Sequence, residues 1–276
     1  MKIHVLVDNN TLVDQYYLAE PGFSVLIVDD DLKVLLDTGY SDIFIRNAQK
    51  MGLDLTSLDY VALSHSHIDH TWGLEPLIRY YSELRTAKIP HSKPSLIAHS
   101  QTFISVIEEN FSEFGSLMSK EKIAKHFELK LSDQPVWLNE KLIFLGQIPR
   151  KNDFESNLRF GKKEGAKEED WVIEDSALAY KSKEGLVIIT GCSHSGICNI
   201  IDYARQICNE DRVIDILGGL HLQKPPQKQI QGTRRFLKEL NLKRIHACHC
   251  TDLKSKIALS KVVDVKEVGV GLTLSY

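Results

Sequence analysis

The stretch Ser64-His65-Ser66-His67-Ile68-Asp69-His70 places three imidazoles and one carboxylate in one short segment, directly after the apolar run Val61-Ala62-Leu63. The apolar run is typical of a buried strand. The polar residues are therefore predicted to lie in the loop at the carboxyl edge of that strand, where open α/β sheets bind their ligands. Imidazole and carboxylate are standard ligands of zinc, iron and manganese, so the stretch predicts a metal site rather than a solvated loop.

The spacing within this motif favours two ions over one. His65 and His67 can converge on a single ion at the strand end. Asp69 and His70 follow one bend later and cannot easily reach the same ion without strain. A second ion about 3.5–4 Å away explains the additional ligands.

The composition describes a globular chain with no strong electrostatic signature. The 276 residues carry a net charge of −3, so neither nucleic acid nor an anionic membrane is expected as a partner. Residues 1–7 read as a strand, because Asp8 and Asn9 interrupt the apolar run before a signal peptide could form. No apolar run approaches the roughly 20 residues of a transmembrane helix. We expect a soluble, cytoplasmic protein with residues 1–276 in one domain.

The cysteines favour a reducing compartment over a disulfide framework. Their number is odd, and all lie in the last third of the chain: Cys192, Cys198, Cys208, Cys248 and Cys250. If the strand around residue 247 continues past His249, Cys248 and Cys250 both point to the face opposite that histidine. We therefore expect both to be packing residues, whereas Cys192 is either a small buried thiol or a thiolate ligand.

Strands and helices alternate along most of the chain, which predicts an α/β protein. A hairpin over residues 24–36 ends in Asp37-Thr38-Gly39, and a helix over residues 41–51 stops at Gly52. Residues 74–134 are more polar, and we interpret them as a mostly helical excursion that walls the site, interrupted by a short strand over residues 95–98. Residues 151–170 are charged and predicted to form a mobile loop. Arg150, Lys151 and Arg159 in this region either are solvated or contribute positive charge to a phosphate pocket.

Three later strands each end in a polar cluster that contains a histidine. The predicted strand over residues 186–190 leads to His194, the strand over 213–217 leads to His221, and the strand over 244–248 leads to His249. One histidine at a strand end is more often a satisfied polar residue than a ligand. Three in series, in a chain that already holds the first motif, indicate additional ligands that converge on it.

The chain resembles the metallo-β-lactamase superfamily, whose members are four-layered αββα sandwiches with a dinuclear metal site at the sheet edges. Within it, the chain is similar to the branch that contains the archaeal 7,8-dihydropterin-6-methyl-4-(β-D-ribofuranosyl)aminobenzene 5′-phosphate synthases. The segments that carry this resemblance are Gly22-Phe23-Ser24, Asp37-Thr38-Gly39, residues 190–197, residues 218–222 and Cys248-His249-Cys250-Thr251.

The resemblance implies a role for each matching residue. His65 and His67 would hold the first ion, and Asp69, His70 and His249 the second. His194 is the remaining candidate ligand, for the first ion or for the space between the two. Asp37 would orient a ligand imidazole without touching metal. Asp69 and His221 are the candidate catalytic residues, with His221 as a general acid or substrate contact if it binds no metal.

The chain also departs from the superfamily pattern at two places. Many superfamily hydrolases have a bridging aspartate where this chain has Cys192. A middle histidine in a Gly-His-Thr context is absent, because the comparable strand end reads Gly146-Gln147-Ile148-Pro149-Arg150. Either His194 and His221 replace the missing ligands, or the first ion is bound weakly.

Two kinds of chemistry follow for a site with two divalent ions, of which zinc is favoured and manganese or iron also fit. The first is hydrolysis of an ester or phosphodiester. The second, implied by the resemblance, is transfer of a pterin from its diphosphate to an arylamine. Both need a small phosphate-bearing substrate, and neither needs an organic cofactor. A closed structural or redox-sensing metal site is the non-catalytic alternative. The oligomeric state is left open, a homo-oligomer included.

Overall fold

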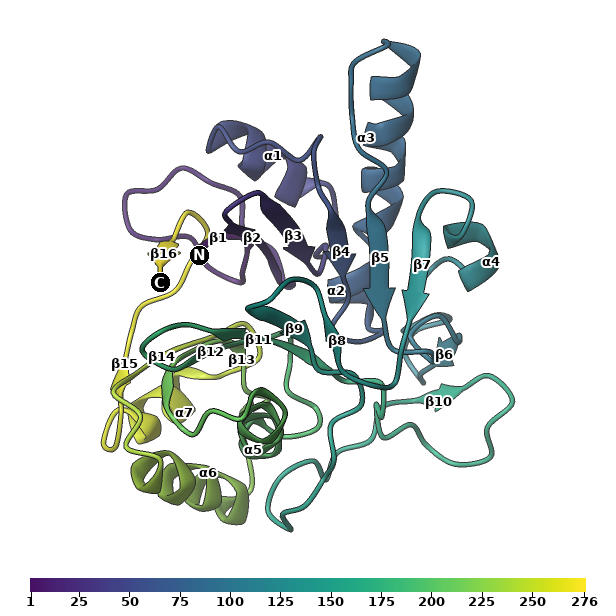
Figure 1. The fold of residues 1–276 in the computed structure, drawn as a ribbon. Helices are drawn as coiled ribbons and strands as arrows, with labels where there is room; N and C mark the ends of the chain where they lie inside the picture. Colours follow the sequence, from purple (N-terminus) through teal and green to yellow (C-terminus); the bar gives the residue numbers. More distant parts are fainter.

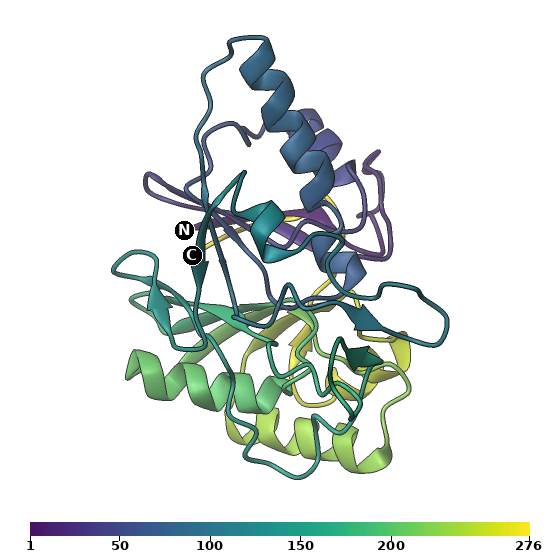
Figure 2. The ribbon, with the colours of Figure 1, turned by 90° about the vertical axis from the view of Figure 1, so that its right-hand side faces the viewer.

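The computed structural model describes residues 1–276 and arranges them in four layers, with two sheets face to face and helices on both outer sides (Figure 1, Figure 2). The predicted αββα class is confirmed. The first sheet has the spatial order β16 (Thr273–Ser275), β1 (Lys2–Val7), β2 (Ser24–Asp29), β3 (Leu32–Leu36), β4 (Tyr60–Ala62), β5 (Ser95–Ala98) and β7 (Glu128–Leu131).

The second sheet mirrors the first in its construction. Its order is β15 (Asp264–Val265), β14 (Arg244–Cys248), β13 (Val213–Gly219), β12 (Leu186–Thr190), β11 (Ala177–Lys181), β9 (Leu142–Phe144) and β8 (Val136–Trp137). In each sheet an antiparallel half adjoins a parallel half: β3, β4, β5 and β7 are parallel in one, and β12 to β15 in the other. The carboxyl ends of the parallel strands lie together at one edge of the sandwich.

Helices cover the two outer faces. On the first sheet lie α1 (Ile43–Lys50) and α3 (Leu74–Thr86), and on the second lie α5 (Ile197–Cys208), α6 (Gln227–Glu239) and α7 (Leu253–Leu259) (Figure 1). The short helices α2 (Ile68–Thr71) and α4 (Lys120–Ile123) belong to connections. In the edge-on view of Figure 2, α3 is at the top, and α5 and α6 are at the bottom.

The strands are apolar on both faces because each sheet is covered on both sides. In β12, Val187 and Ile189 point into the core between the sheets, whereas Leu186 and Ile188 point into the core under α5 to α7. The same alternation in β3 sends Leu35 toward α1 and α3 and Leu36 toward the other sheet. The period of two residues in an extended strand thus builds three apolar layers from nearly continuous apolar runs.

The structure differs from the expected helical excursion over residues 74–134. Apart from α3 and α4, this segment contributes two strands to the first sheet. Strand β5 confirms the predicted strand over residues 95–98 and pairs with β4 from Tyr60↔Ser95 to Ala62↔Ile97, whereas β7 was not predicted. Strand β7 is short and lies between polar turns, so its apolar residues gave a weak sequence signal.

The segment predicted as a mobile loop is held by several contacts. Residues of β10 (Lys162–Lys163) pair with β6 (Val106–Ile107) in a separate two-stranded sheet. Lys163 is buried and forms ion pairs with Asp170 and Glu174. The sequence shows that this segment is charged, but it does not show which charged residues pair with one another.

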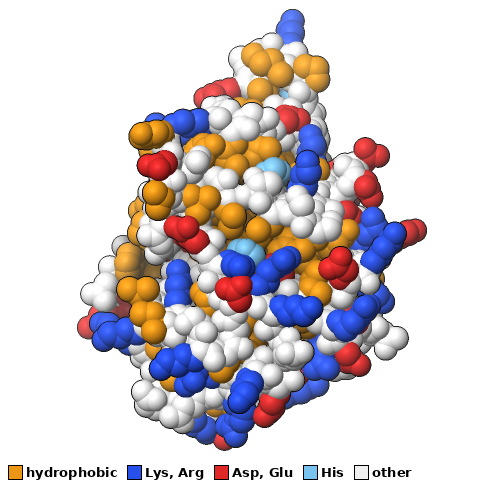
Figure 3. Space-filling view, turned by 90° about the vertical axis from the view of Figure 1, so that its left-hand side faces the viewer, with side chains coloured by type: hydrophobic (Ala, Val, Ile, Leu, Met, Phe, Trp, Pro, Cys, Tyr) orange, Lys and Arg blue, Asp and Glu red, His pale blue; other side chains and the backbone are white.

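The surface carries charges of both signs. On the face in Figure 3, basic and acidic side chains lie beside one another rather than in separate areas, which agrees with the small net charge. None of the helices has both the length and the apolarity that crossing a membrane requires.

The core between the sheets supports a stability prediction. Leu217 of β13 is fully buried there, and Leu217→Ala is expected to lower the free energy of unfolding by about 2–5 kcal/mol through lost burial and a cavity. Urea denaturation measures this change. The control Leu253→Ala removes a leucine that is 71% exposed and should stay within about 0.5 kcal/mol of the parent. Equal effects of the two substitutions would contradict the assigned core.

Candidate metal centre

Three buried histidines form the first group of metal donors. His65 and His67 come from the loop after β4, and His194 comes from the turn after β12. Each offers a ring nitrogen, and these nitrogens lie within 4.8 Å of one another. The Nε2 atoms of all three are buried and have no hydrogen-bond partner. Buried nitrogens without partners are costly, so this group is arranged for a ligand.

A second group lies next to the first and combines a carboxylate with two imidazoles. Asp69 and His70 are on α2, and His249 follows the end of β14. Asp69 Oδ2 is 3.3 Å from His249 Nε2 and 3.7 Å from His70 Nε2. The two Nε2 atoms of His70 and His249 are 3.2 Å apart. The ring of His70 is also close to that of His65, with centroids 4.1 Å apart, so the two groups adjoin.

The outer nitrogens of the second group are fixed by acceptors. His70 Nδ1 is 2.7 Å from Asp37 Oδ2, and His249 Nδ1 is 3.0 Å from Asn9 Oδ1. Both contacts require Nδ1 to donate, which leaves Nε2 of a neutral ring as an acceptor. Two acceptors 3.2 Å apart repel unless a proton or a cation lies between them.

Asp37 also organises the first group through a serine. Its two carboxylate oxygens accept hydrogen bonds from Ser64 N and Ser64 Oγ, each at 2.7 Å. Since Ser64 Oγ donates to Asp37, it accepts from His65 Nδ1 at 2.9 Å, and His65 Nε2 turns inward. A Cβ at Gly191 would lie 2.1 Å from Ser64 Oγ, so only glycine fits beside this pair.

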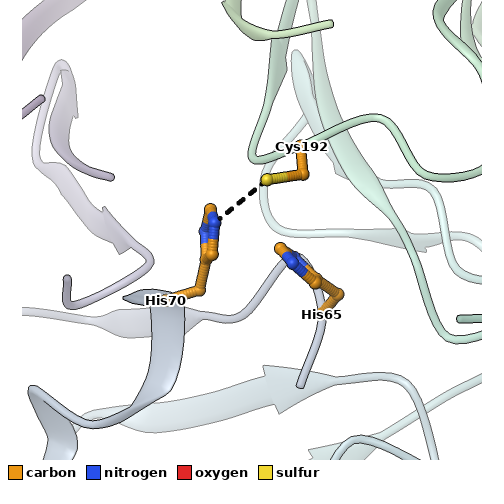
Figure 4. A group of neighbouring side chains, drawn as sticks. All are labelled: His65, His70 and Cys192. Carbon is orange, nitrogen blue, oxygen red and sulfur yellow. Dashed lines mark hydrogen bonds between the residues drawn. The ribbon is translucent and has the colours of Figure 1, made fainter. Parts of the chain in front are cut away.

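Sulfur also lies at the centre. Cys192 Sγ is 3.2 Å from His70 Nε2 and belongs to a donor group with His65 and His70 (Figure 4). In Figure 4 the thiol points from the turn after β12 toward the His70 ring, with His65 beside them. Cys192 also forms a donor group with His249 and Cys250.

Burial keeps the first group uncharged at neutral pH. Desolvation lowers the pKa of His65 and His194 well below the ordinary value, and repulsion from neighbouring imidazoles lowers it further. Desolvation also lowers the pKa of His67 to about 4, although the charges of Asp69 and Glu174 oppose this shift. The opposite occurs in the second group. Although burial opposes it, the hydrogen bond with Asp69 raises the pKa of His249 to about 9, and His70 and His249 lower the pKa of Asp69.

Several residues at the centre have left-handed backbone conformations. The φ angles are +56° at Asp37, +60° at Ser193, +50° at His221 and +48° at His249. Such angles are unfavourable for residues other than glycine and are concentrated at functional sites. Here they re-aim side chains at the points where strands end.

A buried ionic chain ties the loop over residues 151–175 to the histidine motif. Lys163 pairs with Asp170 and Glu174, and Glu174 Oε1 accepts a hydrogen bond of 2.6 Å from Ser66 Oγ. Ser66 lies between His65 and His67 in the sequence. The loop and the donors are therefore held in one arrangement.

Two phenylalanines close one side of the first donor group. The ring centroid of His67 lies 4.6 Å from that of Phe114 and 5.4 Å from that of Phe160. Both phenylalanines also line an open cleft of about 770 Å³, together with Arg159 and Lys162. The cleft adjoins the first donor group through these two phenylalanines and is large enough for a small organic molecule.

His221 is adjacent to the donors but belongs to neither group. Its ring centroid is 4.4 Å from that of His194 and 5.3 Å from that of Phe160. The ring is half-buried and makes no hydrogen bond within the protein. Its position suits a substrate contact better than a metal ligand.

Comparisons with known proteins agree with the fold. A family model described as the metallo-β-lactamase superfamily matches residues 18–86. The crystal structure of Tm1679, a metal-dependent hydrolase of the β-lactamase superfamily, superposes over 100% of this chain and 99% of its own, with a TM-score of 0.81 and 27% identity. The fold is that of the metallo-β-lactamase superfamily, and residues 18–86 match its family model.

Two relatives from Methanocaldococcus jannaschii are similar over nearly the whole length of this chain. One is an uncharacterized protein, 29% identical over 260 residues, or 94% of each chain. The other is 7,8-dihydropterin-6-methyl-4-(β-D-ribofuranosyl)-aminobenzene-5′-phosphate synthase, 29% identical over 271 residues, or 93% of this chain and 89% of the relative.

The donor set fits the divalent metal that this superfamily fold implies. The first group offers three inward nitrogens without hydrogen bonds, and the second has two imidazole Nε2 atoms 3.2 Å apart that need a proton or a cation between them. Neutral imidazole and ionised carboxylate are the forms that bind metal.

The structure brings together every residue predicted as a ligand: His65, His67, Asp69, His70, His194 and His249. Their role as ligands stays a prediction. The interpretation of Cys250 as a residue facing away from the site is wrong. Strand β14 ends at Cys248, and the positive φ of His249 breaks the alternation, so Cys250 turns toward Cys192. Cys248 does lie in the core between the sheets.

Some residues of the centre were not recognised from the sequence. Asp8 accepts a hydrogen bond from the backbone N–H of His249, and Asn9 orients the His249 ring, whereas the sequence indicates only that these two residues end the first strand. Both residues follow a strand end, as the other site residues do, and this position is the feature of the sequence that could have identified them as site residues. Phe114 and Glu174 carried no comparable signal, because they lie in irregular segments.

The orienting role of Asp37 can be tested by substitution. Asp37→Asn removes the charge that orients His70 and, through Ser64, His65, and should weaken zinc binding about 10–100-fold. Competition with a chromophoric chelator measures the affinity. The matched control is Asp59→Asn. Asp59 accepts a hydrogen bond from the backbone N–H of Lys33 outside the donor groups, so this change should leave zinc affinity unchanged. An unchanged affinity in Asp37→Asn would contradict the orienting role.

Proposed function

We propose that the chain is an enzyme with two divalent ions that acts on a small substrate carrying a phosphate or diphosphate. The adjoining donor groups carry this proposal: His65, His67 and His194 would hold one ion, and Asp69, His70 and His249 the other. Zinc is the favoured ion. When bound, such ions supply Lewis acidity and positive charge to a phosphoryl group and its leaving oxygen.

The protein supplies the surroundings of the reaction. Phe114 and Phe160 exclude water from one side of His67. Arg159 lines the cleft, where it stacks on Trp171 with 4.1 Å from Cζ to the ring centroid, and can face an anionic substrate group. Arg150 is less suited to that role, because it donates hydrogen bonds to the carbonyl groups of Trp171 and Val172.

His221 is the candidate proton donor or acceptor of the proposed reaction. The ring is half-buried, stands beside His194 and has no protein partner, so a substrate can reach it. Asp69 is a candidate metal ligand, and its side chain is 27% exposed, so a substrate can also reach its carboxylate. We assign catalytic roles to both residues.

The reaction that similarity favours is transfer of a dihydropterin group to an arylamine. The basis is the synthase relative, which matches over 93% of this chain. In this reaction the arylamine nitrogen bonds to the methylene carbon of the pterin, the diphosphate leaves with the electrons of the C–O bond, and the amine proton passes to a base. Hydrolysis of a phosphodiester is the second candidate, favoured by the similarity to Tm1679, a metal-dependent hydrolase. Five free cysteines support a cytoplasmic location.

The decisive experiment separates the two reactions. Protein loaded separately with zinc, manganese or iron is incubated with dihydropterin diphosphate and the arylamine ribose phosphate, and products are identified by mass spectrometry. Parallel samples receive bis(4-nitrophenyl) phosphate. We expect the coupled product with at least one metal. Phosphodiester cleavage without coupling would support the hydrolase instead. The absence of both products would contradict the proposal.

His67→Ala tests whether the activity belongs to this centre. The variant should lose bound metal and activity together and keep its circular dichroism spectrum, because it removes a ligand and not a core residue. His91→Ala changes a histidine outside the centre, whose Nδ1 contacts the carbonyl oxygen of Ile89, and should retain both properties. Full activity in His67→Ala would contradict the site.

A further inference from the structure

Two of the five cysteines are placed differently from the other three. Cys198 and Cys208 lie in the apolar core under α5 to α7, and Cys248 lies in the core between the sheets. Cys192 and Cys250 belong to none of the apolar cores, although both are buried. Free cysteines usually pack as small apolar residues, so these two positions need another explanation.

The two sulfurs converge with a histidine nitrogen. The Sγ atoms of Cys192 and Cys250 and a ring nitrogen of His249 lie within 4.8 Å of one another. They come from the ends of β12 and β14, which flank β13 in the parallel half of the sheet. Cys192 Sγ is also 3.2 Å from His70 Nε2, so the sulfurs adjoin the second donor group.

The backbone around Cys250 leaves room for its sulfur and presents a donor to it. The N–H of His221 donates to Cys250 Sγ at 3.2 Å, a contact that favours the thiolate. A Cβ at Gly219 would lie 2.5 Å from Cys250 Sγ, so glycine is required beside it. Cys250 Sγ also lies 3.5 Å from the carbonyl oxygen of Cys192, a contact that a neutral thiol would donate. The contact with the His221 N–H suits a thiolate that binds metal, whereas the contact with the Cys192 carbonyl suits a neutral thiol that only packs.

We propose that Cys250, together with Cys192, gives the second metal position two sulfur donors and makes it selective for a thiophilic divalent ion. Thiolate favours zinc, cobalt and cadmium over manganese and magnesium, which prefer oxygen. The inference rests on the metal centre of the proposed function but not on the reaction or the substrate.

Cobalt substitution tests the proposal directly. Cobalt(II) bound by thiolate has a sulfur-to-metal charge-transfer band in the near ultraviolet, which nitrogen and oxygen ligands do not give. The band should be present in the cobalt-loaded protein, weaker in both Cys250→Ser and Cys192→Ser, and lost in the double variant. Cys248→Ser is the matched control, because this thiol is buried in the core between the sheets, and its band should equal that of the parent.

X-ray absorption of the zinc-loaded parent provides a measurement that needs no variant. Two sulfur neighbours per zinc at the second position are expected, which averages to one per ion when both positions are filled. A full band in Cys250→Ser, or a sulfur count that Cys192 alone explains, would overturn the role of Cys250. Both readouts are independent of turnover. They can therefore succeed or fail separately from the proposed reaction.

Discussion

The centre depends on the carboxylate of Asp37. One residue after β3, it accepts two hydrogen bonds from Ser64 and one from His70, all at 2.7 Å, and Ser64 passes the orientation on to His65. One buried carboxylate therefore fixes a ring in each donor group. The surrounding constraints follow from it: Gly191 has no room for a side chain beside the Asp37–Ser64 pair, and the left-handed conformation of Asp37 aims the carboxylate at the loop. A buried carboxylate requires such complete hydrogen bonding, because an unpaired one is costly.

The two sheets explain why donors far apart in the sequence meet. Parallel strands of both sheets end at the same edge of the sandwich, so β4, β12 and β14 deliver their loops to one volume. The apolar runs of these strands could be recognised from sequence because they are buried on both faces. The candidate ligands His65, His67, His194 and His249 could be identified from the sequence for the same reason, since each follows a strong strand signal. This part of the fold and site was predictable from pattern alone.

Other features depend on contacts that no local pattern encodes. The position of Cys250 results from a single positive φ at His249, which reverses the side-chain alternation expected from a continuous strand. The order of the loop over residues 151–175 depends on the ion pair between Lys163 and Glu174. It also depends on the hydrogen bond between Glu174 and Ser66, which are 108 positions apart in the sequence. Strand β7 forms through its pairing with β5 at the edge of the first sheet. In each case tertiary structure overrides the local signal.

The number of metal ions per chain tests the central claim most directly. Calorimetric titration of metal-free protein with zinc should show two ions bound per chain, and His194→Ala, which removes one nitrogen of the first group only, should retain tight binding of one. Binding of a single ion by the parent protein, or equal loss of both ions in His194→Ala, would contradict a centre built from two adjoining donor groups.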